Sequence, residues 1–180
     1  MRGADARELS VGQRVEPRFA LGLCPWVQVV NGRVQLRPRG DLPEYRDAFS
    51  RTERLVERAR RRFAPGKPSR FNSVFAARDP ALWAADLAGQ EQRRLVRLAP
   101  VPGGRACEVD ARYLEQAFAE MQRFEQARTF GEKRRIVAHA RDLARRYWTR
   151  PTRGRGARPD ARPEVLLGGG ARFLGVAAGR

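Results

Sequence analysis

The sequence predicts an α+β fold in a single domain that spans residues 1–180. Three observations carry this prediction. Residues 26–37 alternate apolar and polar side chains around an Asn-Gly pair, which is typical of a β-hairpin. Three stretches, beginning with residues 45–63, repeat apolar residues at helical spacing, and residues 164–177 predict two strands about a glycine turn. Helices and strands therefore come in groups, and a 42% hydrophobic content in 180 residues suffices for one sizeable core.

The first half of the chain supplies a helix, a short strand and a second helix. In residues 45–63 one apolar stripe is expected to be buried, and arginines fill the opposite face. The stretch "APGKP" at 64–68 ends this helix, and "FNSVFAA" at 71–77 predicts a strand. Asp79 and Pro80 are typical of an N-cap and a first helical position, and that helix is expected to end at Gly89. The buried stripe consists of Phe49, Val56, Ala59 and Phe63, and the arginines are Arg51, Arg54, Arg58, Arg60, Arg61 and Arg62.

The second half supplies strands at 94–99 and 106–110 around the turn "PVPGG", followed by two helices that are expected to pack on each other. Asp110 is expected to cap the first of these helices, and Thr129 with Glu132 fits a capping box for the second. Residues 149–163 are rich in Arg, Pro and Gly, which predicts an exposed, flexible, cationic loop. The inward-facing residues are Leu114, Ala117, Phe118, Met121 and Phe124 in the first helix, and Ile136, Val137, Ala140, Leu143, Ala144 and Tyr147 in the second.

The charge balance indicates a polyanionic partner. The formal net charge is +17 and the isoelectric point is about 11.5, so the surface attracts nucleic acid at physiological salt unless a protein partner covers it. Only Lys67 and Lys133 are lysines, a skew toward arginine that GC-rich coding produces without selection for binding. That skew explains the choice of arginine better than it explains 37 basic residues against 20 acidic ones. Nucleic acid is therefore the expected partner, and a protein partner stays open.

Several function classes are disfavoured by the residues present. Cys24 and Cys107 are isolated and His139 is the only histidine, so no metal site is expected, and we give His139 no role. No apolar run approaches the roughly 20 residues of a membrane span, and no stretch has the apolar core of a signal peptide. We therefore expect a reduced, cytoplasmic compartment and no membrane contact. The sequence contains no P-loop, no G-x-G-x-x-G and no Ser/His/Asp set.

Three separated stretches carry a resemblance to a known family. They are "RGADARELSVGQRVEPRF" at 2–19, "SRFNSVFAARDPALWAADLAG" at 69–89 with the strand "RLVRLAP" that follows, and "PEVLLGGGARFLGV" at 163–176. Together they resemble the single-domain ADP-ribosyltransferase fold, in particular rifampin ADP-ribosyltransferase and related bacterial domains of unassigned function. The resemblance implies a split mixed or antiparallel sheet with flanking helices. It also implies an enzyme that consumes NAD and needs no metal.

The resemblance implies a set of site residues. Breaking the nicotinamide–ribose bond of NAD builds positive charge on the ribose, which the carboxylate of Glu164 would stabilise in the transition state. Ser73 would hold the glutamate and a ribose oxygen in register, with Arg70 and Asn72 beside it. The remaining NAD contacts are Arg2 of the Arg2-Gly3 pair for the pyrophosphate, and Trp26 or Tyr45 for stacking on the nicotinamide.

Two departures from the family pattern limit what carries over. Arg2 lies next to the first methionine, which leaves no residues for the strand that carries this arginine in the family, so either the true start lies upstream or this strand is reduced. Arg162 stands two residues before Glu164, where many protein-modifying relatives place glutamate or glutamine to orient the acceptor. An arginine acceptor on a protein is therefore disfavoured, and a nucleic acid, a small molecule or another group suits the cationic surroundings better.

Each candidate residue also has a structural interpretation. Glu164 is as readily a solvated carboxylate, Ser73 a hydrogen-bonded strand serine, and Trp26, Trp83 and Trp148 packing residues.

Two hypotheses of function follow. The first is an ADP-ribosyltransferase that uses NAD to modify a nucleic acid or a nucleic-acid-associated target. The second is a catalytically inactive basic module of the same fold that binds RNA, DNA or a larger assembly. A transferase in the style of the RNA 2′-phosphotransferases ranks last, because no matching histidine motif is present. The arginines expected to hold phosphates are Arg54, Arg58, Arg61, Arg62, Arg153, Arg155 and Arg158.

Overall fold

The computed structural model describes residues 10–16, 27–30, 33–36, 43–78 and 96–176, and it confirms a mixed α+β fold in which the described strands pair antiparallel. The helices are α1 (Pro43–Phe63), α3 (Ala111–Gln126), α4 (Phe130–Thr149) and the 3₁₀ helix η1 (Arg70–Asn72). The strands are β1 (Arg14–Val15), β2 (Val27–Val30), β3 (Arg33–Leu36), β4 (Ser73–Ala76), β5 (Val96–Pro100), β6 (Ala106–Asp110), β7 (Pro163–Gly168) and β8 (Ala171–Val176).

The described strands outside the β2–β3 hairpin form two three-stranded sheets, one in the order β4-β7-β6 and the other in the order β1-β8-β5. The chain changes sheet between β5 and β6 and again between β7 and β8, because β5 pairs with β8 and β6 pairs with β7. At the crossing from β7 to β8, Gly169 and Gly170 have φ of +78° and +113°, which residues with a side chain rarely adopt. The glycine turn therefore moves the chain from one sheet to the other and does not close a hairpin.

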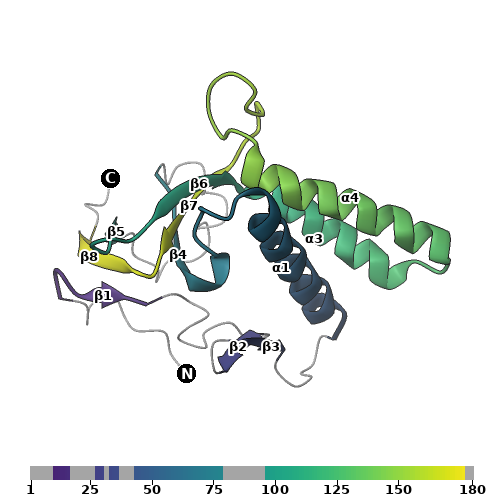
Figure 1. The fold of residues 1–180 in the computed structure, drawn as a ribbon, viewed down its shortest axis with the longest axis horizontal. Coiled ribbons are helices and arrows are strands. Elements are labelled where there is room, and N and C mark those ends of the chain that lie inside the picture. Colours follow the sequence, from purple (N-terminus) through teal and green to yellow (C-terminus); the bar gives the residue numbers. More distant parts are fainter. Residues whose placement is uncertain (1–9, 17–26, 31–32, 37–42, 79–95, 177–180) are drawn as a thin grey trace.

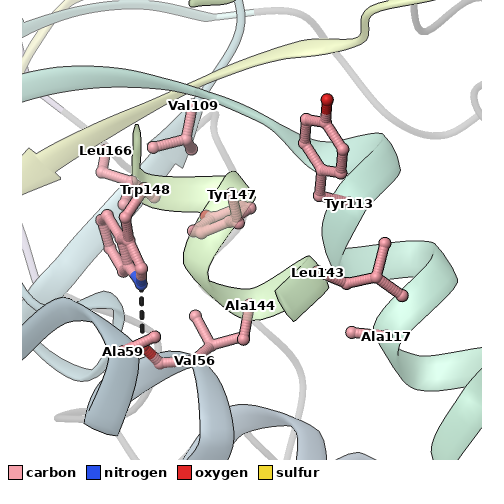
Figure 2. Close-up of a cluster of buried hydrophobic side chains, with 10 residues drawn as sticks. All are labelled: Val56, Ala59, Val109, Tyr113, Ala117, Leu143, Ala144, Tyr147, Trp148 and Leu166. Atoms are coloured by element: carbon pink, nitrogen blue, oxygen red, sulfur yellow. Dashed lines mark hydrogen bonds between the residues drawn. The ribbon is translucent and has the colours of Figure 1, made fainter. Parts of the chain in front are cut away.

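The three long helices lie together on one side of the β4-β7-β6 sheet (Figure 1). Each helix buries an apolar stripe, as the sequence predicts. The prediction is wrong for Phe63, the last residue of α1, which is 45% exposed, and α1 also buries the charged residues Glu53 and Glu57. Their buried side chains meet Val109 of β6 and Leu166 of β7, as Figure 2 shows. Trp148 is at the centre of this core, and its indole Nε1 donates a hydrogen bond to the carbonyl oxygen of Val56 at 2.7 Å. A second cluster, formed by Ala48, Met121, Ala127, Ile136 and Ala140, continues the helix packing.

Local signals predicted correctly where α3 and α4 begin. Asp110 caps α3, with its carboxylate accepting from the backbone N–H of Arg112 at 3.0 Å, and Thr129 caps α4, with its hydroxyl accepting from Glu132 N–H at 3.2 Å. The hairpin is also confirmed, with Val30 opposite Arg33.

The stretch 71–77 is shorter as a strand than predicted. A 3₁₀ turn takes up its first residues, because the Ser69 hydroxyl caps η1 by accepting from Phe71 N–H. The strand β4 then begins at Ser73. The helix predicted from Asp79 to Gly89 lies outside the described residues, and so does the turn at 31–32.

The segment between α4 and β7 contains neither helix nor strand, as predicted for 149–163, but its side chains contact the rest of the protein. Thr152 donates a hydrogen bond to Glu108 of β6, and Arg158 donates to Gln116 of α3 at 3.0 Å. The guanidinium of Arg158 also lies 5.1 Å from the ring centroid of Tyr113. Flexibility of this loop stays a prediction, and the contacts show where it is attached.

Gly168 gives a direct test of the packing between the β4-β7-β6 sheet and the turn after α1. A Cβ at this position would lie 2.5 Å from Cβ of Pro68 and 3.2 Å from the carbonyl oxygen of Arg105. We expect Gly168→Ala to lower the free energy of unfolding by about 1–3 kcal/mol, measured by urea denaturation. The control is Gly66→Ala, where a Cβ has no neighbour within 4 Å, and we expect a change within about 0.5 kcal/mol. Equal midpoints for the two variants would contradict the packing described here.

Candidate active site

A buried charge cluster joins four elements at the interface between the helices and the β4-β7-β6 sheet. We call it the Arg70 cluster, and it consists of Glu53 of α1, Arg70 of η1, Tyr147 of α4 and Glu164 of β7. The side chains of Arg70 and Glu53 are only 8% and 3% exposed, and that of Glu164 is 12% exposed. Such burial is tolerated only when the charges are paired and hydrogen-bonded.

The Arg70 guanidinium supplies most of the hydrogen bonds in the cluster. Its Nε donates to both carboxylate oxygens of Glu53, at 3.3 and 3.1 Å, and its Nη2 donates to Glu53 Oε1 at 3.1 Å. Its Nη1 donates to Glu164 Oε1 at 2.6 Å and also to the hydroxyl oxygen of Tyr147. The Tyr147 hydroxyl in turn donates to Glu164 Oε1 at 2.9 Å. One oxygen of Glu164 is therefore held by two donors.

The electrostatics of the cluster keep the arginine charged and the tyrosine neutral. Burial acts to lower the pKa of Arg70, but the neighbouring Glu53, Tyr147 and Glu164 outweigh it and raise the pKa well above its usual value. Burial raises the pKa of Tyr147 well above its usual value, although the positive charge of Arg70 opposes the shift. The guanidinium also lies 4.6 Å from the ring centroid of Phe75, which adds a cation–π contact.

Two of the residues expected at the site meet directly, and a third lies farther along the same face. Arg70 and Glu164 form an ion pair. Ser73 is opposite Gly168 in the β4–β7 register, so it points to the same sheet face as Glu164 but lies four residues along β7, roughly 13 Å away. The Ser73 hydroxyl is fully buried and donates to the carbonyl oxygen of Ser69 at 2.7 Å. The geometry thus groups Arg70 with Glu164 and leaves Ser73 at the other end of the strand.

The remaining NAD-binding candidates are either exposed or outside the described part of the structure. The side chain of Asn72 is exposed, and its backbone carbonyl accepts from Gly169 N–H at 2.7 Å. Tyr45 lies in the first turn of α1, and its side chain is outside the described part of the structure. Arg2, Gly3 and Trp26 also lie outside the described residues. Trp148 is a core residue, as its structural interpretation predicted.

Glu53 and Tyr147 were not predicted from the sequence as members of the cluster. Glu53 follows Phe49 by four residues and precedes Val56 by three, so it falls on the stripe that was expected to be buried. A charged residue on such a stripe indicates a buried ion pair, and this signal was available. Tyr147 was correctly placed on the inward face of its helix, but nothing in the sequence indicated which group its hydroxyl contacts.

A pocket opens beside the Arg70 cluster, between α1 and α3. Its volume is about 180 Å³. Apolar walls come from both helices, and Arg70 and Glu53 form part of the polar lining. Glu115 also lines the pocket, and its carboxylate accepts from Arg112 at 3.1 Å and from Arg162 at 2.7 Å. The full lining is Phe49, Thr52, Glu53, Arg70, Leu114, Glu115 and Phe118.

A second charge cluster connects the end of α1 to the turn that follows it. Glu57 accepts from Arg60 at 3.0 and 2.8 Å, from Arg61 at 3.1 Å, and from the Ser69 hydroxyl at 2.9 Å. Burial acts to raise the pKa of Glu57, but these hydrogen bonds outweigh it and the pKa is lowered. Arg60 also donates to the carbonyl oxygen of Lys67 at 2.9 Å. This cluster fixes the turn from which Arg70 projects.

No metal-binding group emerges from the described residues: none of their His, Cys, Asp and Glu side chains gather in threes or more.

Cys107 lies near Glu164, and burial raises the pKa of its thiol to about 11, with Glu164 adding to the shift and Lys67 opposing it. The thiol is therefore protonated at neutral pH. Among the described helices, none is both long and apolar enough to span a bilayer.

The exposed face of α1 carries the cationic surface expected from the sequence. Arg51, Arg54, Arg58, Arg61 and Arg62 are all exposed there. Arg51 pairs with Glu125 at 2.8 Å and Arg61 with Glu57 at 3.1 Å, whereas Arg54 and Arg58 contact no carboxylate among the described residues.

Two of the three loop arginines expected to hold phosphates form ion pairs. Arg153 pairs with Glu108 at 3.1 Å, and Arg158 pairs with Asp160 at 2.9 Å. Arg155 is exposed and contacts no carboxylate in the described part of the chain. Of the seven arginines expected to hold phosphates, four contact no carboxylate among the described residues, namely Arg54, Arg58 and Arg62 of α1 and Arg155 of the loop.

Comparison with known proteins adds no assignment, because neither a protein-family model nor a curated protein matches this chain. The function must therefore be argued from the residues of the site and from their geometry.

Proposed function

We propose that the protein is an ADP-ribosyltransferase that uses NAD to modify a nucleic acid or a nucleic-acid-associated target. The observation that carries this proposal is the arrangement of the Glu164 carboxylate. Oε1 is fixed by Arg70 and Tyr147, whereas Oε2 accepts no hydrogen bond from any described residue. A carboxylate held at one oxygen and open at the other suits a group that must meet developing positive charge.

The surroundings of Glu164 support the same chemistry. Cleavage of the nicotinamide–ribose bond leaves positive charge on the ribose, and a fixed carboxylate stabilises that charge more in the transition state than in the ground state. Arg70 and Tyr147 act as positioning residues, since they hold Oε1 without occupying Oε2. Glu164 lies on β7 next to β6, so its backbone position is set by the sheet and not by a loop.

Transfer of labelled ADP-ribose from NAD to DNA, RNA and protein tests the proposal. We expect Glu164→Gln to lower the transfer rate at least about a hundredfold, because the amide keeps the shape of the side chain but not its charge. The control is Glu120→Gln on α3, a carboxylate that is 12% exposed like Glu164 and pairs with Arg123 at 2.9 Å, away from the Arg70 cluster. Its rate per folded molecule should match the unchanged protein. Transfer that persists in Glu164→Gln, or no transfer to any of the three acceptors, would contradict the proposal.

The second candidate is a basic module that binds nucleic acid without catalysis. Arg54 and Arg58 favour it, because they are exposed one helical turn apart on α1 and pair with no carboxylate in the described part of the chain. Under this proposal NAD leaves the melting temperature unchanged at millimolar concentration, whereas short RNA or DNA duplexes raise it.

Salt titration of binding locates the nucleic-acid contact. We expect Arg54→Gln with Arg58→Gln to reduce the slope of log K against log salt by about 2, since each arginine contacts one phosphate. The matched control is Arg153→Gln with Arg158→Gln, which removes the same charge from arginines already paired with acids. An equal change of slope in the two double variants would refute the assignment to α1. Fluorescence anisotropy with a labelled duplex measures both.

A further inference from the structure

The exposed faces of the three long helices differ in charge. From Ala48 onward, every exposed residue of α1 is an arginine, apart from Phe63 at its end. The exposed residues of α4 include four arginines and no acid, whereas those of α3 are mainly glutamines. A polyanion is therefore attracted to α1 and α4 more than to α3. The exposed arginines are Arg51, Arg54, Arg58, Arg61 and Arg62 on α1, and Arg134, Arg135, Arg141 and Arg145 on α4.

The cationic faces of α1 and α4 come together near the turn between α3 and α4. Arg51 of α1 lies 5.1 Å from the ring centroid of Phe124, in the last turn of α3, and Lys133 of α4 lies 5.3 Å from the same centroid. Two cations from different helices therefore converge on one aromatic ring. Figure 1 shows this turn at the end of the helical layer that lies away from both sheets.

Phe130 projects on the side of α4 that faces α1. The indole of Trp148 marks this side, because it donates a hydrogen bond to the carbonyl oxygen of Val56 in α1. Five helical turns of about 3.6 residues separate Phe130 from Trp148, so the two side chains point to the same side of α4. Trp148 is buried in the core, whereas Phe130 is 82% exposed. An exposed aromatic ring therefore lies beside the cationic face of α4.

The arginines that follow Phe130 on the same side of α4 are not neutralised by acids. Arg134 comes about one turn after Phe130 and Arg141 about three turns after it. Both are exposed, and neither pairs with a carboxylate among the described residues. His139 lies on the opposite side of α4, with Nδ1 3.4 Å from Glu120 of α3. We define the Phe130 surface as Phe130, Arg134 and Arg141 of α4 together with Arg54 and Arg58 of α1.

An exposed ring among arginines without acidic partners suits a nucleic acid whose bases are unpaired. Arginines contact the phosphates of any nucleic acid, but an aromatic side chain stacks on the face of a base, and the bases of a duplex already stack on one another. An acidic peptide would pair with the arginines and offer no base face to the ring.

We propose that the Phe130 surface binds single-stranded DNA or RNA, with Phe130 stacked on a base and the arginines on the phosphates. This inference rests on the nucleic-acid contact proposed above, and it specifies the form of nucleic acid that makes the contact.

Fluorescence anisotropy with a labelled oligothymidylate and with a blunt duplex of equal phosphate number tests the inference. We expect Phe130→Ala to weaken binding of the single strand roughly tenfold and to leave duplex binding unchanged. Phe130→Tyr keeps a ring that stacks and should bind like the unchanged protein. Phe130→Leu keeps apolar bulk without a ring and should resemble Phe130→Ala. Because Phe130 is 82% exposed, these variants are expected to fold normally.

Two arginine variants test the phosphate contacts on α4. We expect Arg141→Gln to reduce the slope of log K against log salt for the single strand by about 0.7, the value for one phosphate. The matched control is Arg123→Gln on α3, an exposed arginine that already pairs with Glu120 at 2.9 Å, and it should leave the slope unchanged. Equal slopes for the two variants would contradict the position of the strand on α4.

The outcomes distinguish this inference from the nucleic-acid contact on which it rests. If Phe130→Ala weakens binding of the single strand and the duplex equally, or weakens neither, the contact stands and the inference is overturned. If the unchanged protein binds neither nucleic acid, both are overturned. Polyglutamate that displaces the labelled strand as readily as an unlabelled strand of equal charge would assign the surface to an acidic protein and overturn the inference.

Discussion

Replacing Arg70 with methionine is expected to lower the free energy of unfolding by about 3–5 kcal/mol, because it leaves Glu53 and Glu164 buried without a counter-charge. The methionine retains much of the volume of the arginine stem, so the loss reflects charge and hydrogen bonding more than a cavity. Chemical denaturation measures the change, with circular dichroism confirming that the variant folds.

Two further variants separate this effect from a general loss of charge. Arg70→Met combined with Glu53→Gln and Glu164→Gln removes the two orphaned carboxylates, and we expect it to regain most of the lost stability. Arg51→Met breaks an ion pair whose arginine is 49% exposed, and we expect a cost within about 1 kcal/mol. If Arg70→Met costs no more than Arg51→Met, the Arg70 cluster does not have the energetic role assigned to it here.

Replacing Trp148 with alanine is expected to cost about 3–5 kcal/mol, because the indole is 1% exposed at the junction of α1, α4 and β7. The change leaves a cavity and an unpaired carbonyl oxygen on Val56. Trp148→Phe keeps an aromatic ring and loses the N–H donor, so its cost should be nearer 1 kcal/mol.

An exposed aromatic residue supplies the control for this prediction. Phe130 begins α4 and is 82% exposed, so Phe130→Ala should change stability by no more than about 0.5 kcal/mol. Thermal and urea denaturation of the three variants measure the order. Equal losses for Trp148→Ala and Phe130→Ala would contradict the position of Trp148 in the core.

The sequence predicted helices well because the relevant signals are local. Asp110 and Thr129 are adjacent to the helices they cap, and the apolar stripes of α3 and α4 repeat every turn. These local signals do not indicate which strands pair with each other. The "PVPGG" turn joins β5 and β6, and nothing in those residues indicates that the two strands enter different sheets.

The candidate site was predicted only in part, because its contacts join residues that are far apart in the sequence. The resemblance named Arg70, Ser73 and Glu164, and two of these form an ion pair between residues 94 positions apart. The other partners of Arg70 are Glu53 and Tyr147, which lie 17 and 77 positions away. Burial and periodicity indicate that a residue faces inward, but they carry no information on which inward-facing group it meets. A buried charge in a helix stripe shows only that a partner exists.

The pairing of β1 with β8 links the beginning of the described chain to its end, and Arg14 Nη2 donates to the carbonyl oxygen of Gly169 across 155 positions. The β1-β8-β5 sheet therefore closes a much longer loop than the contacts of α1 with α3 and α4 do. Closure of this long loop is the expected slow step of folding.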